Sequence, residues 1–265
     1  MIFRKLLPKQ VVCKLEEWKI GLLIHDFLFQ IPYIVYFNFR YLPWRQAVKF
    51  PIWLHVRSLR APKGRIVIDS DTIKPGMIIL GPKQYIYHKS GLYLINEGTI
   101  VFRGNCWISN ETRITVLRNA QFIIGDNTGI STSKIICAKS IELGKHVFVG
   151  VDCSFMDSDF HPVIDIIGKV YINPTIPVKI GDYNWLGAET MVMKGTKTPR
   201  HVIVGARSIL NKRYRIPECS CLMAVGGNEI VGEGYVRDWK DLSKTMSSRK
   251  INDIEEVKKE LDIIV

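Results

Sequence analysis

Apolar residues return at every sixth position through much of the chain, often followed by a small residue such as Gly, Ser or Cys. The positions in this rhythm are Ile124, Ile130 and Ile136, then after a shift of one residue Leu143, Val149 and Phe155, and after a longer gap Ile180, Leu186, Val192, Thr198, Val204, Leu210 and Ile216. Looser matches lie upstream, at Ile66, Thr72 and Ile78 and at Leu94, Ile100 and Cys106. Only Thr198 in the last run lacks a large apolar side chain.

A period of six fits neither a helix, with its period of 3.6, nor a lone alternating strand. It fits a parallel β-helix built from hexapeptides, in which each unit is one short strand and one turn, and three units close a triangular coil. The apolar residue then points inward and stacks on its equivalents in neighbouring coils. The small residue beside it allows a tight corner. We expect this domain over residues 64–217 and an all-β fold class.

The residues before it, 1–63, are rich in aromatic and basic side chains. Glu16 to Phe29 has the spacing of an amphipathic helix, and Tyr41 to Leu59 is interpreted as irregular or as a second short helix. Two interpretations stay open for this segment. It caps the end of the following domain, or its basic, aromatic face lies on an anionic membrane surface.

The residues after it, 218–265, leave the rhythm. Glycines mark turns near the start of this segment. Ile254, Val257, Leu261 and Ile264 then fall at helical spacing in a polar context. We expect a short amphipathic helix that packs on the β-helix or on a neighbouring subunit.

Composition excludes several classes of protein. The 265 residues are 47% hydrophobic and 23% charged, an ordinary globular balance that rules out a mainly disordered chain. The net charge is +12, and residues 1–60 hold ten Lys and Arg against three Asp and Glu. This excess favours anionic partners. The chain shows no nucleic-acid-binding motif, so nucleic acid is not an expected partner.

The cysteines and the apolar runs bear on the compartment. The six cysteines form no CxxC pair and show no zinc-finger spacing, so we expect reduced thiols in the cytosol. No membrane-spanning run of about 20 apolar residues and no signal peptide is predicted. The expected location is cytoplasmic, with peripheral contact at the inner membrane face as the alternative.

The rhythm breaks between Phe155 and Ile180, and the break is rich in groups that can do chemistry. It contains Asp157, Asp159 and His161. Interruptions of a solenoid are where binding groups tend to lie. A histidine beside carboxylates can take a proton from a hydroxyl near neutral pH, which makes His161 the strongest candidate for a general base. A solvated loop histidine is the alternative.

Three segments here resemble a known family. DSDFHPVID, IGDYNWLGAETMVMKG and VIVGARSIL are similar to the hexapeptide-repeat acyltransferases, and most similar to the O-acetyltransferases of bacterial capsule, O-antigen and exopolysaccharide synthesis. The resemblance covers about residues 64–235 and is most specific over 143–212. FNFRYLPWRQAVKFPIW also looks like a leader found in some polysaccharide acetyltransferases.

The resemblance implies a left-handed parallel β-helix that works as a homotrimer, with acyl-CoA bound between two subunits. It assigns His161 as general base and Trp185 to the acceptor and pantetheine site, where we also place Asn184 and Asp157. The residues expected along CoA are Gly187, Ala188, Gly205 and Ala206, with Lys212 and Arg213 near the nucleotide phosphates.

The predicted reaction is transfer of an acetyl group from acetyl-CoA to a sugar hydroxyl of a bacterial surface polysaccharide or of its lipid- or nucleotide-linked precursor. His161 deprotonates the hydroxyl, and a backbone N–H stabilises the oxyanion. Asp159 is the first choice to orient His161 and Asp157 the second; both could also be solvated turn carboxylates. Cys153 and Ser154 lie in no nucleophile motif and are assigned to packing. One departure from the family, Thr198 to His201, leaves the CoA contacts of that coil open.

Alternatives of other kinds stay open. The same base would serve an N-acyltransferase acting on a nucleotide-linked amino sugar. A non-enzymatic β-solenoid scaffold is the other alternative. The metal-dependent branch of the fold requires an H-x-x-x-x-H pair, which none of the six histidines forms, so no metal is expected.

Overall fold

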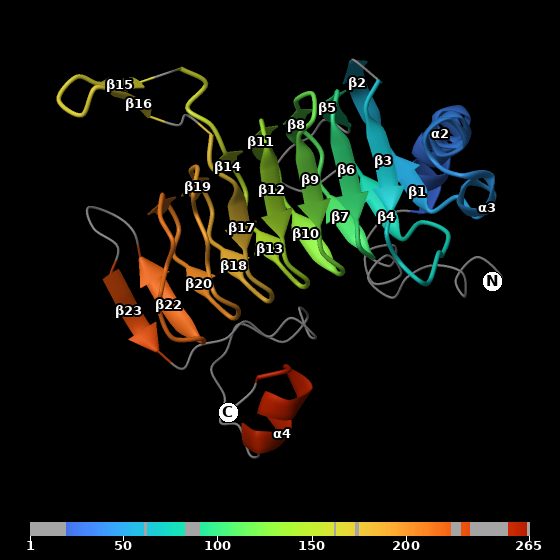
Figure 1. The fold of residues 1–265 in the computed structure, drawn as a ribbon. Coiled ribbons are helices and arrows are strands. Elements are labelled where there is room, and N and C mark those ends of the chain that lie inside the picture. Colours follow the sequence, from blue (N-terminus) through green and yellow to red (C-terminus); the bar gives the residue numbers. More distant parts are fainter. Residues whose placement is uncertain are drawn as a thin grey trace.

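The computed structural model describes residues 20–60, 63–82, 91–161, 163–172, 175–223, 229–233 and 254–263. These residues form a parallel β-helix with helices at its N-terminal end and near its C-terminal end (Figure 1). The predicted all-β, parallel β-helix class is confirmed. The left-handed sense of the coil comes from the family resemblance.

Three parallel sheets form the sides of a triangular prism. The nine-stranded sheet contains β1 (Ile52–Leu54), β4 (Ile78–Leu80), β7 (Cys106–Ile108), β10 (Thr128–Ile130), β13 (Phe148–Val149), β18 (Trp185–Leu186), β20 (Ile203–Val204), β22 (Ser220–Met223) and the antiparallel β23 (Glu229–Glu233). The seven-stranded sheet contains β2 (Val56–Arg60), β5 (Leu92–Asn96), β8 (Arg113–Val116), β11 (Ser133–Cys137), β14 (Cys153–Met156), β19 (Met191–Val192) and β21 (Ile209–Leu210). The five-stranded sheet contains β3 (Arg65–Ile68), β6 (Thr99–Phe102), β9 (Gln121–Ile124), β12 (Ser140–Leu143) and β17 (Val178–Ile180).

The sixfold rhythm fills the inside of this prism. Most of its aliphatic positions are buried, including Ile124, Leu186 and Leu210. Two positions of the predicted rhythm are wrong. Thr72 is exposed, and Ile136 is only half-buried because β11 turns Ile135 and Cys137 inward instead. The one-residue shift therefore falls between Ile130 and Cys137, before the position that the pattern suggested.

The β-helix extends beyond both of its expected boundaries. The strands β1 and β2 lie before residue 64, yet they pair in parallel with β4 and β5. At the other end, β22 lies after residue 217 and pairs in parallel with β20. The first coil thus begins at Ile52.

The N-terminal helices cap this first coil. The helix α2 (Ile20–Tyr41) continues beyond the expected end at Phe29, through Pro32, and the short α3 (Trp44–Ala47) follows it. The expected start at Glu16 lies outside the described residues. Packing explains the continuation. Phe37 is buried against the core, and the free energy gained by this burial is larger than the cost of the backbone hydrogen bond that Pro32 cannot donate. No helix among the described residues has the length and apolar character needed to cross a membrane.

Asn38 fastens α2 to the first strand. Its side-chain amide donates to the carbonyls of Ile34 at 2.8 Å and Ile52 at 2.7 Å, and its Oδ1 accepts the N–H of Ile52 at 3.1 Å. The side chain is fully buried. These bonds satisfy backbone groups at the edge of the sheet, where no further coil lies to pair with them.

The C-terminal helix, α4 (Ile254–Glu260), is attached to the β-helix through the residue pair that follows it. Leu261 is buried. The carboxylate of Asp262 accepts hydrogen bonds from the Tyr183 hydroxyl at 2.8 Å and from Lys145 at 3.3 Å. Arg200 donates to the backbone carbonyl of Asp262 at 2.8 Å. The predicted helix is confirmed, and the Asp262 that follows it binds the β-helix of the same chain.

The corner that departs from the family pattern forms this attachment. The ring of Tyr183 stacks between His146 and His201, with centroids 4.9 and 4.5 Å away. A ring nitrogen of His201 lies 3.2 Å from the carbonyl oxygen of Asp262. The unusual Arg200-His201 pair therefore binds the C-terminal segment.

We predict that acid loosens this attachment. Burial lowers the pKa of His201 below its usual value of about 6.5. The hydrogen bond from Tyr183 is the main cause that lowers the pKa of Asp262. Both groups bind fewer protons when folded, so their contribution is complete above their unfolded pKa values and is lost as the pH falls through the folded ones. His201 responds first, below about pH 6.5.

Hydrogen-exchange protection of the amides in 254–263, corrected for intrinsic rates, should therefore fall between about pH 7 and pH 5. His201→Phe keeps a ring against Tyr183 and removes the titrating group, so its protection should change much less over that range. An equal pH dependence in the two proteins would contradict the assignment.

Candidate functional site

The break in the rhythm leaves the β-helix at the corner between the seven- and five-stranded sheets. The chain exits after β14 and returns at β17. Between them it forms an antiparallel hairpin of β15 (Val163–Asp165) and β16 (Val170–Ile172), which projects away from the prism (Figure 1). The interval that interrupts the rhythm is therefore an extruded hairpin and not an irregular coil.

Asp157 closes the corner that the hairpin leaves open. Its carboxylate accepts the backbone N–H groups of Ala138, Lys139 and Ser140, each at 2.7 Å, and it is fully buried. Those three donors lie at the corner of the preceding coil, where the diverted chain provides no strand to receive them. A buried carboxylate with three donors holds backbone in place. Asp157 is therefore turned away from the acceptor site and from His161, where the sequence suggested it.

Two further contacts fix the base of the hairpin. Ser158 and Thr175 form an isolated bridge between the outgoing and returning chain, and their hydroxyls are 2.9 Å apart. Asp159 forms an ion pair with Lys194, from the corner of the following coil. Sequence reasoning missed Lys194 because it lies 35 residues from its partner. The available signal was its place in the segment IGDYNWLGAETMVMKG, which resembles the acyltransferase family.

His161 stands on this fixed base with its side chain exposed. The preceding Phe160 has a positive φ of 61°, which turns the chain sharply before the histidine. Asp159 was the first choice to orient His161, but its carboxylate pairs with Lys194. The structure therefore places both aspartates in the base of the hairpin, below the histidine.

Trp185 points outward from the nine-stranded sheet. The side chain is 39% exposed, so it is not part of the core. In the sheet register it lies between Phe148 on β13 and Ile203 on β20. Together they form an apolar column on the outside of this sheet. Such a surface can pack on a pantetheine arm, on a sugar face or on another protein chain.

The residues expected along CoA divide between two corners. Gly187 and Ala188 directly follow β18, and Gly205 and Ala206 directly follow β20, so all four lie beside Trp185 at the edge of the nine-stranded sheet. Lys212 and Arg213 are exposed and follow β21, at the corner that carries the hairpin. One chain therefore does not bring the two groups of predicted residues together.

Asn184 is buried inside the coil and does not face a ligand. Its amide donates to the Thr198 hydroxyl at 2.6 Å, and its Oδ1 accepts the N–H of Val202 at 2.7 Å. Its predicted place in the acceptor site is therefore not supported by the geometry. The pair also explains why a threonine occupies an apolar position of the rhythm, since Thr198 provides the partner that buried Asn184 requires.

The cysteines of this region show no sign of a nucleophile. Cys153 is fully buried, its thiol lies 3.2 Å from the carbonyl oxygen of Gly187, and burial raises its pKa to about 11. A thiol of this kind stays protonated and unreactive at neutral pH. Cys106, Cys137, Cys219 and Cys221 are also free, and Cys13 lies outside the described residues.

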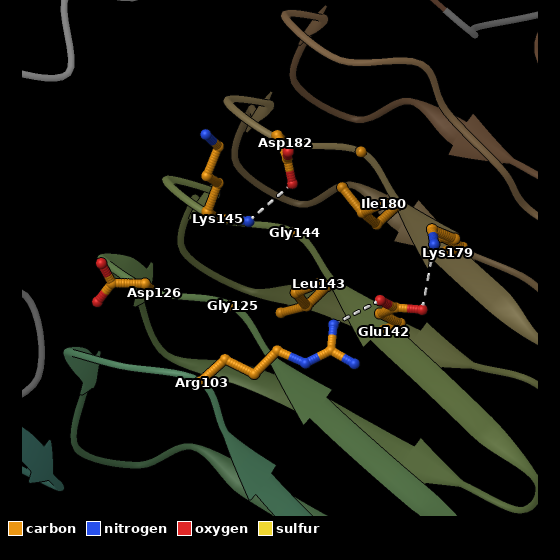
Figure 2. A pocket seen from close by; sticks show the side chains of 11 residues that line it. Arg103, Gly125, Asp126, Glu142, Leu143, Gly144, Lys145, Lys179, Ile180 and Asp182 are labelled. Atoms are coloured by element: carbon orange, nitrogen blue, oxygen red, sulfur yellow. Dashed lines mark hydrogen bonds and ion pairs between the residues drawn. The ribbon is translucent and has the colours of Figure 1, made fainter. Parts of the chain in front are cut away.

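A shallow hollow of about 440 Å³ opens on the five-stranded sheet, away from the hairpin (Figure 2). Glu142 on one side of the hollow accepts from Arg103 at 2.9 Å and pairs with Lys179 at 3.4 Å, so its carboxylate is matched by two bases of the same chain. Glycines of successive coils form its floor. Across the described part of the chain, no group of three His, Cys, Asp or Glu side chains could hold a metal ion.

Comparison with protein-family models gives no match, and comparison with curated proteins gives no relative. Among solved structures, the polySia-specific acetyltransferase NeuO is similar over 81% of this chain and 99% of its own, at 18% identity and a TM-score of 0.48. The polysialic acid O-acetyltransferase OatWY is similar over 74% of this chain and 90% of its own, at 21% identity and a TM-score of 0.38.

A third similar structure is a mutant of AntD, an N-acyltransferase from Bacillus cereus, in complex with dTDP-4-amino-4,6-dideoxyglucose and coenzyme A. It covers 77% of this chain and 93% of its own, at 13% identity and a TM-score of 0.40. All three carry names from the class of enzyme that the sequence resembles. Because the identities and TM-scores are low, we base the functional proposal on the chain's own residues.

The base of the hairpin gives a stability prediction. Asp157→Ala removes a buried carboxylate and leaves three backbone N–H groups without their acceptor, which should lower the free energy of unfolding by about 3–5 kcal/mol. Asp159→Asn is the matched control, since its partly exposed ion pair contributes no more than about 1 kcal/mol. Urea unfolding of the two variants measures the difference. Equal losses would contradict the role assigned to Asp157.

Proposed function

We propose that this protein is an acyl-CoA-dependent O-acyltransferase, with acetyl-CoA as donor and a sugar hydroxyl of a bacterial surface polysaccharide or its precursor as acceptor. One observation carries the proposal: the break between Phe155 and Ile180 presents an exposed histidine on a base held by hydrogen bonds and an ion pair. The sequence motifs around His161 and Trp185 give the chemistry its class. The reaction takes place in the cytoplasm.

His161 acts as the general base in this proposal. Its neutral imidazole takes the proton of the acceptor hydroxyl while the oxygen attacks the thioester carbonyl carbon. A backbone N–H at a coil corner donates to the oxyanion. The carbon–sulfur bond then breaks, and the leaving thiolate takes the proton back from the imidazolium. The thioester is already activated, so the chain needs no covalent intermediate of its own.

The exposed groups around the two corners can bind the donor. The indole of Trp185 offers an apolar face to the pantetheine arm or to the sugar ring. Ala188 and Ala206, beside it, leave room for a chain to lie close to the backbone. Lys212 and Arg213 supply positive charge for the phosphates of CoA. These assignments retain the motif-matched residues that the structure leaves accessible.

The geometry favours a site shared between copies of the chain. His161 lies at the corner between the seven- and five-stranded sheets, which in a triangular prism is opposite the outer face of the nine-stranded sheet that bears Trp185. In one copy, the corner that carries the hairpin and the nine-stranded sheet that contains β18 therefore lie on opposite sides of the prism. A ligand that touches both must lie between two copies, as in the homotrimer that the resemblance implies.

The tip of the hairpin supports the same arrangement. Asp165 accepts the N–H groups of Ile167 at 3.0 Å and Gly168 at 2.9 Å, which fixes the turn. Ile166 and Ile167 are nevertheless 83% and 95% exposed. Two isoleucines held in water by an ordered turn are typical of a contact with another protein surface. We assign that surface to the apolar column of a neighbouring copy.

The base assignment predicts that His161→Ala lowers acyl transfer by about 10²–10⁴-fold. His146→Asn is the matched control: it also replaces a histidine, it suits the positive φ of 55° at that position, and it lies away from the hairpin. It should retain transfer. Release of CoA thiol with bacterial polysaccharide acceptors is the measurement, and unchanged turnover in His161→Ala would sink the base assignment.

The shared site predicts complementation between two inactive proteins. When His161→Ala and Trp185→Ala chains are unfolded together and refolded as mixed oligomers, about one site in four has an intact His161 from one copy and an intact Trp185 from its neighbour. Transfer should return to about a quarter of the wild-type rate. A mixture no more active than its two components would show that each site belongs to a single chain.

A further inference from the structure

The outer face of the N-terminal cap is apolar, aromatic and exposed. The inner side of α2 covers the first coil with Ile34, Phe37 and Asn38. The exposed apolar side chains of α2 and α3 are Ile31, Tyr33, Val35, Tyr36, Phe39, Trp44 and Val48, and together we call them the outer face. Terminal caps of solenoids normally need a polar outer surface for solubility. This cap has the opposite character.

The outer face carries exposed basic side chains. Residues 27–68 contain seven Lys and Arg and no Asp or Glu. Arg40, Arg45 and Lys49 are exposed on the same two helices and the turn after them. With no carboxylate in this stretch of the chain, the outer face has a positive potential that favours an anionic partner.

The outer face is held in a fixed orientation. The three buried hydrogen bonds of Asn38 fasten α2 to the first strand. Phe39 contacts the rings of Trp44 on α3 and Phe50 beyond it, with centroids 5.1 and 5.9 Å away. The two helices that carry these aromatic side chains lie at one end of the prism (Figure 1).

We propose that the outer face docks on an anionic lipid bilayer, with the N-terminal end of the prism against the membrane. Exposed Trp and Tyr side chains suit the boundary between headgroups and acyl chains. Trp44, 71% exposed, and Tyr33, 61% exposed, are placed to enter it. Arg40, Arg45 and Lys49 would meet the lipid phosphates. A face of this kind enters a bilayer by about 5–10 Å and does not span it.

A bilayer fits this face better than a second copy of the same face does. A symmetric contact brings each patch against its own equivalent, so the bases would face bases with no acid from residues 27–68 between them. An anionic headgroup layer supplies the missing negative charge and accepts the aromatic rings at the same depth. The test must therefore distinguish binding of the outer face to a bilayer from self-association through the same face.

The inference does not depend on acyl transfer. It concerns a different end of the molecule from the hairpin, and it would hold for a scaffold without activity. If both proposals are correct, the outer face would bring the enzyme to the surface where lipid-linked sugars are found.

The test measures partitioning of the full-length protein onto vesicles of phosphatidylcholine alone and vesicles that also contain phosphatidylglycerol. The wild type should sediment with the anionic vesicles only, and added salt should weaken its binding. The triple variant Arg40→Gln/Arg45→Gln/Lys49→Gln should bind roughly 100-fold more weakly, at about fivefold for each base. The matched control removes three exposed bases from the middle coils, Arg118→Gln/Lys134→Gln/Lys139→Gln, and should bind like the wild type.

Depth of insertion is read from tryptophan fluorescence with brominated lipids. Quenching should occur in the wild type and be largely lost in Trp44→Phe.

Light scattering in solution, compared between wild type and Trp44→Glu, shows whether the face instead joins two copies. Equal binding to both kinds of vesicle, no binding to either, equal loss in the control triple, or loss of oligomer in Trp44→Glu would each overturn the proposal. Acyl transfer to a soluble acceptor is measured on the same variants. This separates the two proposals, because loss of membrane binding should leave transfer to a soluble acceptor unchanged.

Discussion

Hydrogen bonding between successive coils is the constraint on which the rest of this structure depends. Each strand pairs in parallel with the strand above and the strand below it in its sheet, as β13 does with β10 and β18. Strands that pair in this way must match in length from one coil to the next. Extra residues can therefore leave the β-helix only at a corner between two sheets. The segment after β14 does so, and Asp157 replaces the backbone acceptors that the diverted chain no longer provides. The position of His161 follows from how that corner is closed.

Polar side chains inside and along the prism also hold the coils and the terminal segments in place. Buried Asn184 finds Thr198 one coil away, and the next residues of that coil hold the C-terminal segment through Asp262. The departure from the family pattern at this corner is thus an internal contact with a structural purpose. At the N-terminal end, Asn38 completes the first strand and fixes the helical cap. The start of the β-helix and the coil that holds the C-terminal segment are thus both organised by side chains that satisfy backbone or buried polar groups.

The sequence was most informative at positions where the residue type alone shows whether the side chain is buried. The sixfold rhythm predicted the coils because inward positions must be apolar, and it failed at Ile136, where β11 shifts by one residue. It could not separate Asp157 from Asp159, since whether a carboxylate meets backbone donors or Lys194 depends on residues far away in the chain. Helix α2 crosses Pro32 because Phe37 has a core to cover, which local propensity does not reveal.

We propose that the break in the coil and the apolar column of a neighbouring copy form one site for an acyl thioester. A crystal structure of the protein with coenzyme A would show whether they do. We expect the thiol of CoA within hydrogen-bonding reach of the His161 imidazole, with the pantetheine arm against Trp185 from a second copy. Coenzyme A bound away from His161, or held by His161 and Trp185 of the same chain, would contradict it.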